Sequence, residues 1–356
     1  MRSINRAGRR PTAIIAGLLL VAFTAAPALA CGGLIGPNGA VNLLRTTTLA
    51  GYHDGQEHYV TAFEFAGGGG SFGSLTPLPG VPSSVVKGGD WTLQRLRTET
   101  DPVAESQFLF AAGAAASRDS AEVLMEVTID ALDITVLRGG ADEVGVWATD
   151  HGFRLPPDAP EVLEFYAARS EIFLAAAFDA EAAAERGQQV GDGTAVHITI
   201  PTDNPWVPLR ILALGKTGAE RVEADVYLLT DDAPALLPAP DGLNGMNLDH
   251  SAAASDLLLS DLRSDRGMEW VPASAWLTKV AIDADAPQLG YDLAIDASGA
   301  GSPSRVAAGL DLPGAADPTI ASTIRWALGL AFIVLGIGGI LLLLRYKPRD
   351  SGMRPA

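Results

Sequence analysis

The sequence has a single cysteine, Cys31, and only five histidines among its 356 residues. One cysteine excludes any disulfide bond within the chain. The histidines are dispersed, and none of them lies in an H-E-x-x-H motif or another ligand spacing typical of zinc sites. The sequence therefore contains neither a disulfide framework nor a metal-binding motif that would identify a function.

Basic residues are also scarce, with 25 Lys and Arg against 42 Asp and Glu and a formal net charge of −17. Residues 31–324 hold 16 of the basic residues but 41 of the acidic ones. This balance argues against binding to nucleic acid or to an anionic lipid surface, since both attract positive charge. The acidic residues are scattered along the chain, and we interpret them as a source of solubility.

The N-terminus has the pattern of a secretory signal peptide over residues 1–30. Four arginines come first, an apolar run follows over residues 13–23, and Ala28-Leu29-Ala30 supplies the small-x-small pattern of a cleavage site. The apolar run is too short to span a bilayer. We therefore predict that the chain is exported.

Three alternatives concern how this N-terminus is processed. The first is an uncleaved N-terminal anchor. The second is lipidation of Cys31, which would be the first residue after cleavage, although Ala28 stands where a lipobox has leucine. The third is twin-arginine export through Arg9-Arg10.

The longest apolar run lies near the C-terminus, from Trp326 to Leu344, and contains no charged residue. As a helix it would be about 28 Å long, which matches the hydrocarbon thickness of a bilayer. A buried helix of a soluble domain would show a polar stripe, which is absent here. We predict a transmembrane helix over residues 324–344. The basic residues behind it place a tail, residues 345–356, in the cytoplasm and the bulk of the chain outside the plasma membrane.

We divide the exported part into three segments. Residues 31–235 are predicted to form the main extracytoplasmic domain, residues 236–295 a smaller second segment, and residues 296–323 a flexible stalk. The boundary between the first two lies in a stretch rich in Pro, Gly and Asp, from Asp231 to Asn247.

Short apolar runs without regular strand–helix alternation predict an α+β fold, mainly antiparallel β-sheet with a few helices. A hairpin is predicted within residues 41–66, with its turn at His53-Asp54-Gly55. Further strands are predicted at residues 134–137, 172–178, 195–200, 209–214, 222–229 and 276–282. Four helices are predicted. A short one follows Asp90, which is expected to cap it, and others lie over residues 142–149 and 255–262. The fourth lies over residues 158–169, where Asp158 and Glu161 have the spacing of a capping box.

The motifs that suggest chemistry are weak. Gly69-Gly70-Ser71-Phe72-Gly73 matches the G-x-S-x-G pattern of a nucleophilic serine, but a proline-rich stretch follows where that motif requires a helix. The same absence of a helix argues against a dinucleotide site at these glycines. We interpret the glycine run as a mobile loop.

Two surface metal sites are conceivable, but neither has a recognised spacing. His53 and His58 flank Asp54 and Glu57 around the predicted turn. Four aspartates precede or enter the second segment without EF-hand spacing: Asp231, Asp232, Asp241 and Asp249. The aromatic residues Trp147, Phe153, Phe165, Tyr166 and Trp206 lie among apolar neighbours and are predicted to belong to the core.

Four short motifs follow one another along the exported part. They are Cys31-Gly32-Gly33 with Val41-Asn42 after it, the proline-rich residues 77–82, the segment from Trp147 to Pro156 with His151-Gly152-Phe153 at its centre, and Val207-Pro208-Leu209-Arg210-Ile211.

The order of these motifs, over residues 31–230, resembles an uncharacterised family of exported bacterial proteins, domain of unknown function twenty-three thirty. The family tends to show Asn-Gly-Tyr at the place of residues 151–153. Some members show a second cysteine shortly after the first, which this chain lacks. The resemblance implies export and a shared fold, and it implies no activity.

We assign no catalytic, cofactor-binding or metal-binding residue from the sequence. The topology favours a single-pass, membrane-anchored surface module that binds an envelope protein or polymer and has no enzymatic activity. The alternatives are an envelope hydrolase whose site is assembled from distant residues, and an accessory subunit of a membrane complex. A pocket near His151, Arg154 and Arg210 is the first place to look for a ligand.

Overall fold

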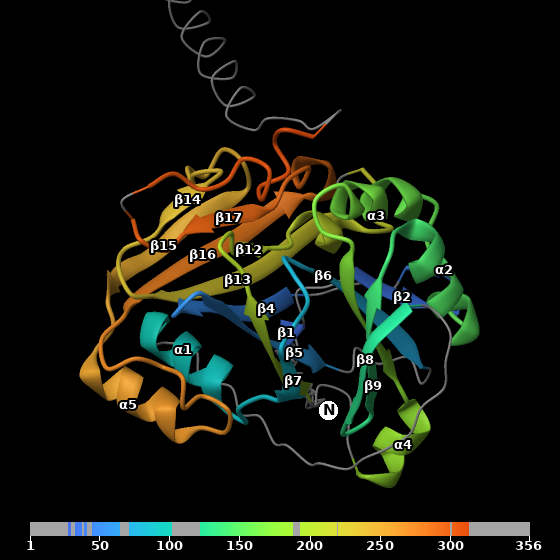
Figure 1. Ribbon diagram of the computed structural model, residues 1–356, viewed down its shortest axis with the longest axis horizontal. Coiled ribbons are helices and arrows are strands. Elements are labelled where there is room, and N and C mark those ends of the chain that lie inside the picture. Colours follow the sequence, from blue (N-terminus) through green and yellow to red (C-terminus); the bar gives the residue numbers. More distant parts are fainter. Residues whose placement is uncertain are drawn as a thin grey trace, which may run out of the picture.

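The computed structural model describes residues 28–29, 33–37, 39–40, 45–64, 71–101, 122–187, 193–218, 220–299 and 301–312. Three β-sheets, which we call A, B and C, make up most of this part, and a few short helices cover their faces (Figure 1). The chain is therefore a β-rich α+β protein with mixed and antiparallel sheets, as the sequence predicts for the exported part.

Sheet A has eight strands, in the order β15-β16-β13-β4-β5-β11-β7, with β1 also paired to β4. Neighbours are antiparallel, except that β1 and β13 run parallel to β4. The strands are β1 (Ala28–Leu29), β4 (Arg45–His53), β5 (Gln56–Glu64), β7 (Ser84–Lys87), β11 (Gly193–Pro201), β13 (Arg221–Thr230), β15 (Met246–Ala253) and β16 (Trp276–Asp285).

The predicted hairpin is confirmed as β4 and β5. Asp54 and Gly55 form its turn, and both have positive φ angles, 49° and 74°. A two-residue hairpin turn of this kind requires positive φ at both central positions, for which Asp-Gly is a preferred pair. Local turn chemistry thus fixes the register of the two strands at the centre of sheet A.

Sheet B has six antiparallel strands in the order β3-β2-β6-β10-β9-β8, and sheet C has three in the order β12-β17-β14. The strands of sheet B are β2 (Gly33–Gly36), β3 (Gly39–Ala40), β6 (Phe72–Leu78), β8 (Glu122–Ile129), β9 (Leu132–Arg138) and β10 (Ile172–Phe178). Those of sheet C are β12 (Trp206–Val207), β14 (Ala235–Leu237) and β17 (Leu293–Asp296). The helices are α1 (Thr92–Thr100), α2 (Ala141–Asp150), α3 (Ala159–Ala167), α4 (Ala180–Glu185) and α5 (Asp256–Ser264), with two short 3₁₀ helices, η1 (Arg210–Ala213) and η2 (Ala286–Gln288).

Sheet A separates two apolar clusters. Along β13, Val226 and Leu228 belong to the larger cluster, which also contains the buried residues of sheet B, whereas Tyr227 and Leu229 belong to a smaller one beneath α1 and α5. Successive side chains of a strand point to opposite faces. β13 therefore carries apolar residues on both faces, as expected for a central strand that is covered on both sides.

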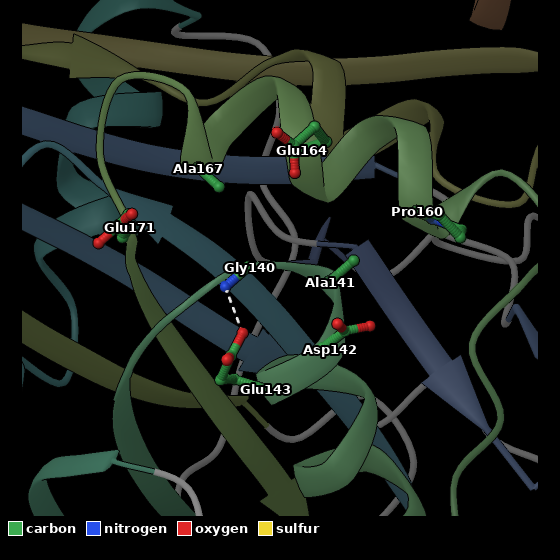
Figure 2. Close-up of a pocket in the computed structure, with 8 residues that line it drawn as sticks. All are labelled: Gly140, Ala141, Asp142, Glu143, Pro160, Glu164, Ala167 and Glu171. Carbon is green, nitrogen blue, oxygen red and sulfur yellow. Dashed lines mark hydrogen bonds between the residues drawn. The ribbon is translucent and has the colours of Figure 1, made fainter.

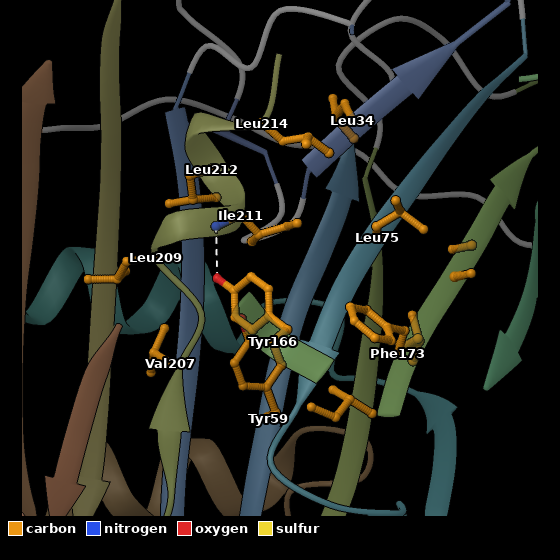
Figure 3. Packing of buried hydrophobic residues seen from close by; sticks show 14 of the residues in the cluster. Leu34, Tyr59, Leu75, Tyr166, Phe173, Val207, Leu209, Ile211, Leu212 and Leu214 are labelled. Atoms are coloured by element: carbon orange, nitrogen blue, oxygen red, sulfur yellow. Dashed lines mark hydrogen bonds between the residues drawn. The ribbon is translucent and has the colours of Figure 1, made fainter. Parts of the chain in front are cut away.

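The strand predicted over residues 209–214 is wrong, because this segment forms η1. Its first three backbone N–H groups bond to side chains, and the amides of Leu212 and Leu214 bond to the carbonyls of Leu209 and Ile211 within the turn. Asp292 accepts hydrogen bonds from the amides of Leu209 (2.6 Å) and Arg210 (2.9 Å), and the hydroxyl oxygen of Tyr166 accepts one from Ile211 (2.8 Å; Figure 3). The apolar residues of the segment then pack into the larger cluster as one turn.

The predicted cap of α1 is wrong, and that of α3 is right in position but not in its hydrogen bonds. The N-cap residue of α1 is Trp91 and not Asp90. The buried carboxylate of Asp265 holds the chain just before α1, accepting hydrogen bonds from the amides of Asp90 and Trp91 and from the hydroxyl of Thr92. At α3 the side chain of Asp158 makes no capping hydrogen bond and accepts one from the amide of Gly215 (2.9 Å) instead. At both helix starts, an aspartate therefore makes its hydrogen bonds with residues distant in the sequence.

Segments that the sequence analysis separates share one sheet in the structure. β15 and β16 come from the predicted second segment, and β16 pairs with β13 of the main domain along ten residues of each strand. Residues 301–312, placed in the predicted stalk, are packed: Ala307, Ala308 and Leu310 are buried in the larger cluster. A composition rich in Gly, Ala and Ser resembles a linker, but small side chains also allow close packing.

Among the described residues, no helix is both long and apolar enough to cross a membrane. The predicted transmembrane helix over residues 324–344, the tail over residues 345–356 and Cys31 lie outside the described residues. Of the predicted signal peptide, only β1 is described, and it pairs with the first two residues of β4. Export and anchoring therefore stay predictions.

Candidate functional site

The structure does not gather the three residues that the sequence marks for inspection. His151 lines a small hollow of about 30 Å³ beside β8 and β9, which has room for a water molecule but not for a larger ligand. Arg154 is exposed, and its backbone amide bonds to the carbonyl of Gly36. Arg210 lines a separate and larger pocket.

The histidines around the hairpin do not form the suggested metal site. His53 is partly exposed, and its Nδ1 lies 2.7 Å from Oδ1 of Asp231. Glu57 and His58 are neighbours in β5, so their side chains point to opposite faces of sheet A. Within the described ranges, no group of three or more His, Cys, Asp or Glu is arranged to hold a metal ion.

His58 instead forms a buried pair with His197. Nδ1 of His58 lies 3.0 Å from Nε2 of His197, and the ring of His58 stacks on Trp270 with their centroids 4.0 Å apart. Burial lowers the pKa of His58 to about 3 and that of His197 to about 4. Both rings are therefore neutral at pH 7, and they pack sheet A against the segment that carries Trp270.

Glu57 is a fully buried carboxyl group on the other face of sheet A. Neither of its oxygens has a hydrogen-bond partner, and burial raises its pKa to about 8. The nearby backbone amide of Trp206 acts in the opposite direction without meeting hydrogen-bond geometry. Glu57 lines none of the pockets described here, and a lone neutral acid has no partner for acid–base chemistry.

Ser71 does not lie in a nucleophile elbow. It is exposed, and strand β6 begins immediately after it where the motif would require a helix. None of the hydrogen bonds among the described residues joins a serine to a histidine.

An acidic pocket of about 460 Å³ lies between α2 and α3 (Figure 2). Its charged side chains are Asp142, Glu143, Glu164 and Glu171, with no basic side chain among the lining residues. Glu143 accepts a hydrogen bond from the amide of Gly140 (2.8 Å), which lowers the pKa of its carboxyl group. The four carboxylates are spread over the surface and do not converge on one point. Helix capping and contact with solvent are therefore enough to explain why acidic residues occur there.

The remaining pocket combines both charges with apolar walls. It has a volume of about 310 Å³ and lies where the first turn of α3, the end of η1 and η2 meet. We call it the α3–η1–η2 pocket. Its lining residues are Asp158, Glu161, Val162, Arg210, Ala213, Lys216, Ala286, Pro287, Leu289 and Gly290. No serine, cysteine or histidine is among them.

A buried network holds the walls of this pocket in place. Asp292 is fully buried and forms an ion pair with the buried guanidinium of Arg169, which also donates a hydrogen bond to the carbonyl of Ala307. The hydroxyl of Tyr166 in α3 donates to Asp292 at 3.0 Å and accepts from Ile211 in η1. One carboxylate thereby connects α3, η1 and the start of β17, so the pocket has a rigid frame.

Two cations line the pocket in different ways. Arg210 pairs with Glu161, their atoms 2.5 Å apart, and its guanidinium lies 4.3 Å from the centre of the Phe165 ring. Lys216 is partly buried, and burial lowers its pKa while Glu220 acts against that shift. Among the described residues, the ammonium of Lys216 has no ion pair.

The sequence matches the family described as uncharacterized protein conserved in bacteria over residues 25–292, which include all the pocket elements. The chain belongs to DUF2330. This confirms the family that the motif order suggests. No curated protein matches the DUF2330 chain.

Solved structures of baculovirus P35 are similar to part of the DUF2330 chain. The structure of P35 alone has 9% identity and a TM-score of 0.33, covering 70% of this chain and 91% of P35. P35 in its complex with caspase-8 has 8% identity and a TM-score of 0.34, and the match covers 70% of this chain and 90% of the other. Scores of this size do not establish a common fold, and nothing about function follows from them.

Of the pocket residues, the sequence analysis marks Arg210 as a place to look for a ligand, and it names Asp158 and Glu161 for helix capping alone. Lys216 lies in a short polar stretch after η1 and carries no motif, and Asp292 lies in a segment with no recognised pattern. Their roles depend on contacts with residues far away in the sequence. The apolar run around Leu212 and Leu214 is the only local sign that this segment is buried.

Proposed function

We propose that this protein is an exported binding module, anchored to the plasma membrane by a single helix over residues 324–344, with the bulk of the chain outside the cytoplasm. The signal pattern over residues 1–30 and the apolar run followed by basic residues support this placement. The positively charged tail would then face the cytoplasm.

The α3–η1–η2 pocket supports a binding role for the ectodomain. The observation that carries this part of the proposal is Lys216, a partly buried cation without an ion pair in a pocket of about 310 Å³. Pockets of this volume accommodate small ligands or a protruding group of a larger partner. The rigid frame around Asp292 would hold the lining residues ready for binding, which reduces the entropic cost of association.

The anchoring is tested on the full-length protein in its membrane. The protein should stay in the membrane fraction during carbonate extraction, and a variant that ends before residue 324 should be released. Protease added to cells stripped of outer layers should digest the ectodomain and spare a tag at the C-terminus. Extraction by carbonate, or digestion of the tag, would contradict the proposed topology.

The binding role is tested by capturing partners of the detergent-solubilised protein and repeating the capture with Lys216→Met. We expect an envelope protein or polymer that the wild-type protein retains and the variant loses. A hydrolase remains the alternative class, and turnover of a captured polymer by the purified protein would favour it.

A further inference from the structure

We infer that the α3–η1–η2 pocket takes a small carboxylate that carries one negative charge next to a compact apolar group. This inference rests on the proposed binding role and is independent of membrane anchoring.

The first argument is the unpaired ammonium of Lys216. Partial burial lowers its pKa, which means that the charged form lacks some of the solvation it would have in water. A carboxylate oxygen would supply the missing interaction, and hydrogen bonds between ionised groups are about twice as strong as neutral ones. A neutral acceptor would form a weaker hydrogen bond with this ammonium.

The second argument is the exchangeable ion pair between Arg210 and Glu161. The side chain of Glu161 is 78% exposed, whereas that of Arg210 is 16% exposed and is held against Phe165. An exposed ion pair contributes little to stability, so Glu161 can leave it at small cost. The guanidinium of Arg210 then presents a planar pair of donors, which matches a carboxylate.

The third argument is the charge balance of the pocket. Arg210 and Lys216 are its cations, and Asp158 and Glu161 are its anions. Asp158 is engaged with the amide of Gly215, so it cannot turn away as readily as Glu161. These four charges balance formally, so the two carboxylates repel a ligand with a single negative charge less than a doubly charged phosphate. The start of α3 favours an anion further.

The fourth argument is the apolar part of the lining. Val162, Ala213, Pro287 and Leu289 surround the charged groups and have no polar side-chain atom. Gly290 adds a wall without a side chain. Such a surface fits an aliphatic group of a few carbon atoms beside the carboxylate and offers no hydrogen-bond partner to a sugar hydroxyl.

The experiment uses the full-length protein in detergent and ligand-observed NMR titration. The probes are N-acetyl-alanine and N-acetyl-leucine, their neutral amides, and inorganic phosphate. We expect the carboxylates to bind about tenfold or more tightly than the amides, because the amides lose the charge-assisted contact. Phosphate should bind more weakly than either carboxylate.

Two substitutions should move the affinity in opposite directions. Lys216→Met keeps the aliphatic stem and should weaken carboxylate binding about tenfold or more, whereas Lys216→Arg should retain it. Glu161→Gln frees Arg210 and should strengthen binding. Arg266→Met, which removes one positive charge from an exposed side chain outside the pocket lining, is the matched control and should leave the affinity unchanged. If Lys216 had a purely structural role, Glu161→Gln would not be expected to increase the affinity for the carboxylate.

The inference would be overturned by any of three results. They are equal affinity for the carboxylates and their amides, tighter binding of phosphate than of the carboxylates, and a Lys216→Met variant that folds and binds the carboxylates as the wild type does. If the protein is anchored and captures a partner but does not bind the carboxylates, only the proposed ligand class is refuted. Carboxylate binding by a protein that proves not to be anchored supports the ligand class and refutes only the topology.

Discussion

Glu57 is a buried carboxyl group whose protonation is linked to folding. Burial raises its pKa from 4.5 to about 8, so the folded state binds a proton that the unfolded state releases between these values. Its contribution to stability is therefore complete below pH 4.5 and is lost as the pH rises towards 8.

Replacing this group by a neutral isostere should remove that dependence. We expect Glu57→Gln to gain stability relative to the wild type as the pH rises, reaching about 4 kcal/mol near pH 8. Urea unfolding of both proteins across this range measures the difference. A constant difference at every pH would show that Glu57 is ionised in the folded protein.

The histidine pair His58–His197 makes the stability of the folded protein depend on pH in the opposite direction. Both pKa values are lowered from 6.5, to about 3 for His58 and about 4 for His197, so the unfolded state binds protons first as the pH falls. The wild-type protein should lose stability as the pH falls from 6.5 to 4. His58→Phe keeps a ring against Trp270 and should show a smaller loss, measured by urea unfolding at both ends of this range. An unchanged loss would contradict the assignment.

Asp292 and Asp283 allow a buried ion pair to be compared with an exposed one. Asp292→Ala leaves the buried Arg169 without a counter-charge and should cost about 3–5 kcal/mol. Asp283→Ala removes an exposed partner of Arg221 and should cost about 1 kcal/mol or less. The free energy of unfolding at one pH measures both. Similar costs would mean that Asp292 does not organise the pocket frame.

Residue patterns alone reveal part of this arrangement. The sequence places Phe165, Tyr166 and Trp206 in the core, and all three are buried there. It does not reveal that Asp292 and Arg169 are buried together, because a charged residue is normally read as exposed unless its partner is known. Lys216 is missed for the same reason, since its burial comes from elements distant in the sequence.

Among the elements, those with strong local signals are predicted best. The Asp-Gly turn predicts the β4–β5 hairpin, and the helix predicted over residues 255–262 is confirmed as α5, where Ser255 accepts from the amide of Leu258. The η1 segment is mistaken for a strand because its first three backbone donors are satisfied by Asp292 and Tyr166, which are side chains far away in the sequence. Apolar spacing over six residues cannot separate the two structures.

The start of α1 tests this dependence on distant residues. Asp265 accepts three hydrogen bonds there, so Asp265→Ala should destabilise the protein by about 1–2 kcal/mol. Asp90→Ala alters the residue that the sequence names as the cap and should cost less than about 0.5 kcal/mol. Thermal unfolding of the two variants compares the contributions of the two carboxylates to stability. A larger effect at Asp90 would restore the local assignment.

At the scale of the whole molecule, sheet A makes the two predicted segments interdependent. β16 covers one edge of β13, and Leu277 of β16 packs in the same cluster as Tyr227 of β13. A chain that ends at residue 235 would leave β13 as an edge strand and remove α5 from the cluster. We expect that fragment to lack a cooperative unfolding transition in calorimetry, while a chain that ends at residue 312 should retain it. Cooperative unfolding of the shorter fragment would show that the sequence boundary separates two domains.

The packed segment 301–312 would shorten the connection between the ectodomain and the proposed membrane anchor. Its last described residue is Leu312, and the proposed anchor begins at residue 324, so about a dozen residues bridge the gap where the sequence analysis allots more than two dozen. Even fully stretched, they extend about 40 Å. Under the proposed anchoring, a pull on the anchor would act on segment 301–312, which is bonded to the rest of the structure by the guanidinium of Arg169 at the carbonyl of Ala307 and by the amide of Asp292 at the carbonyl of Ala308.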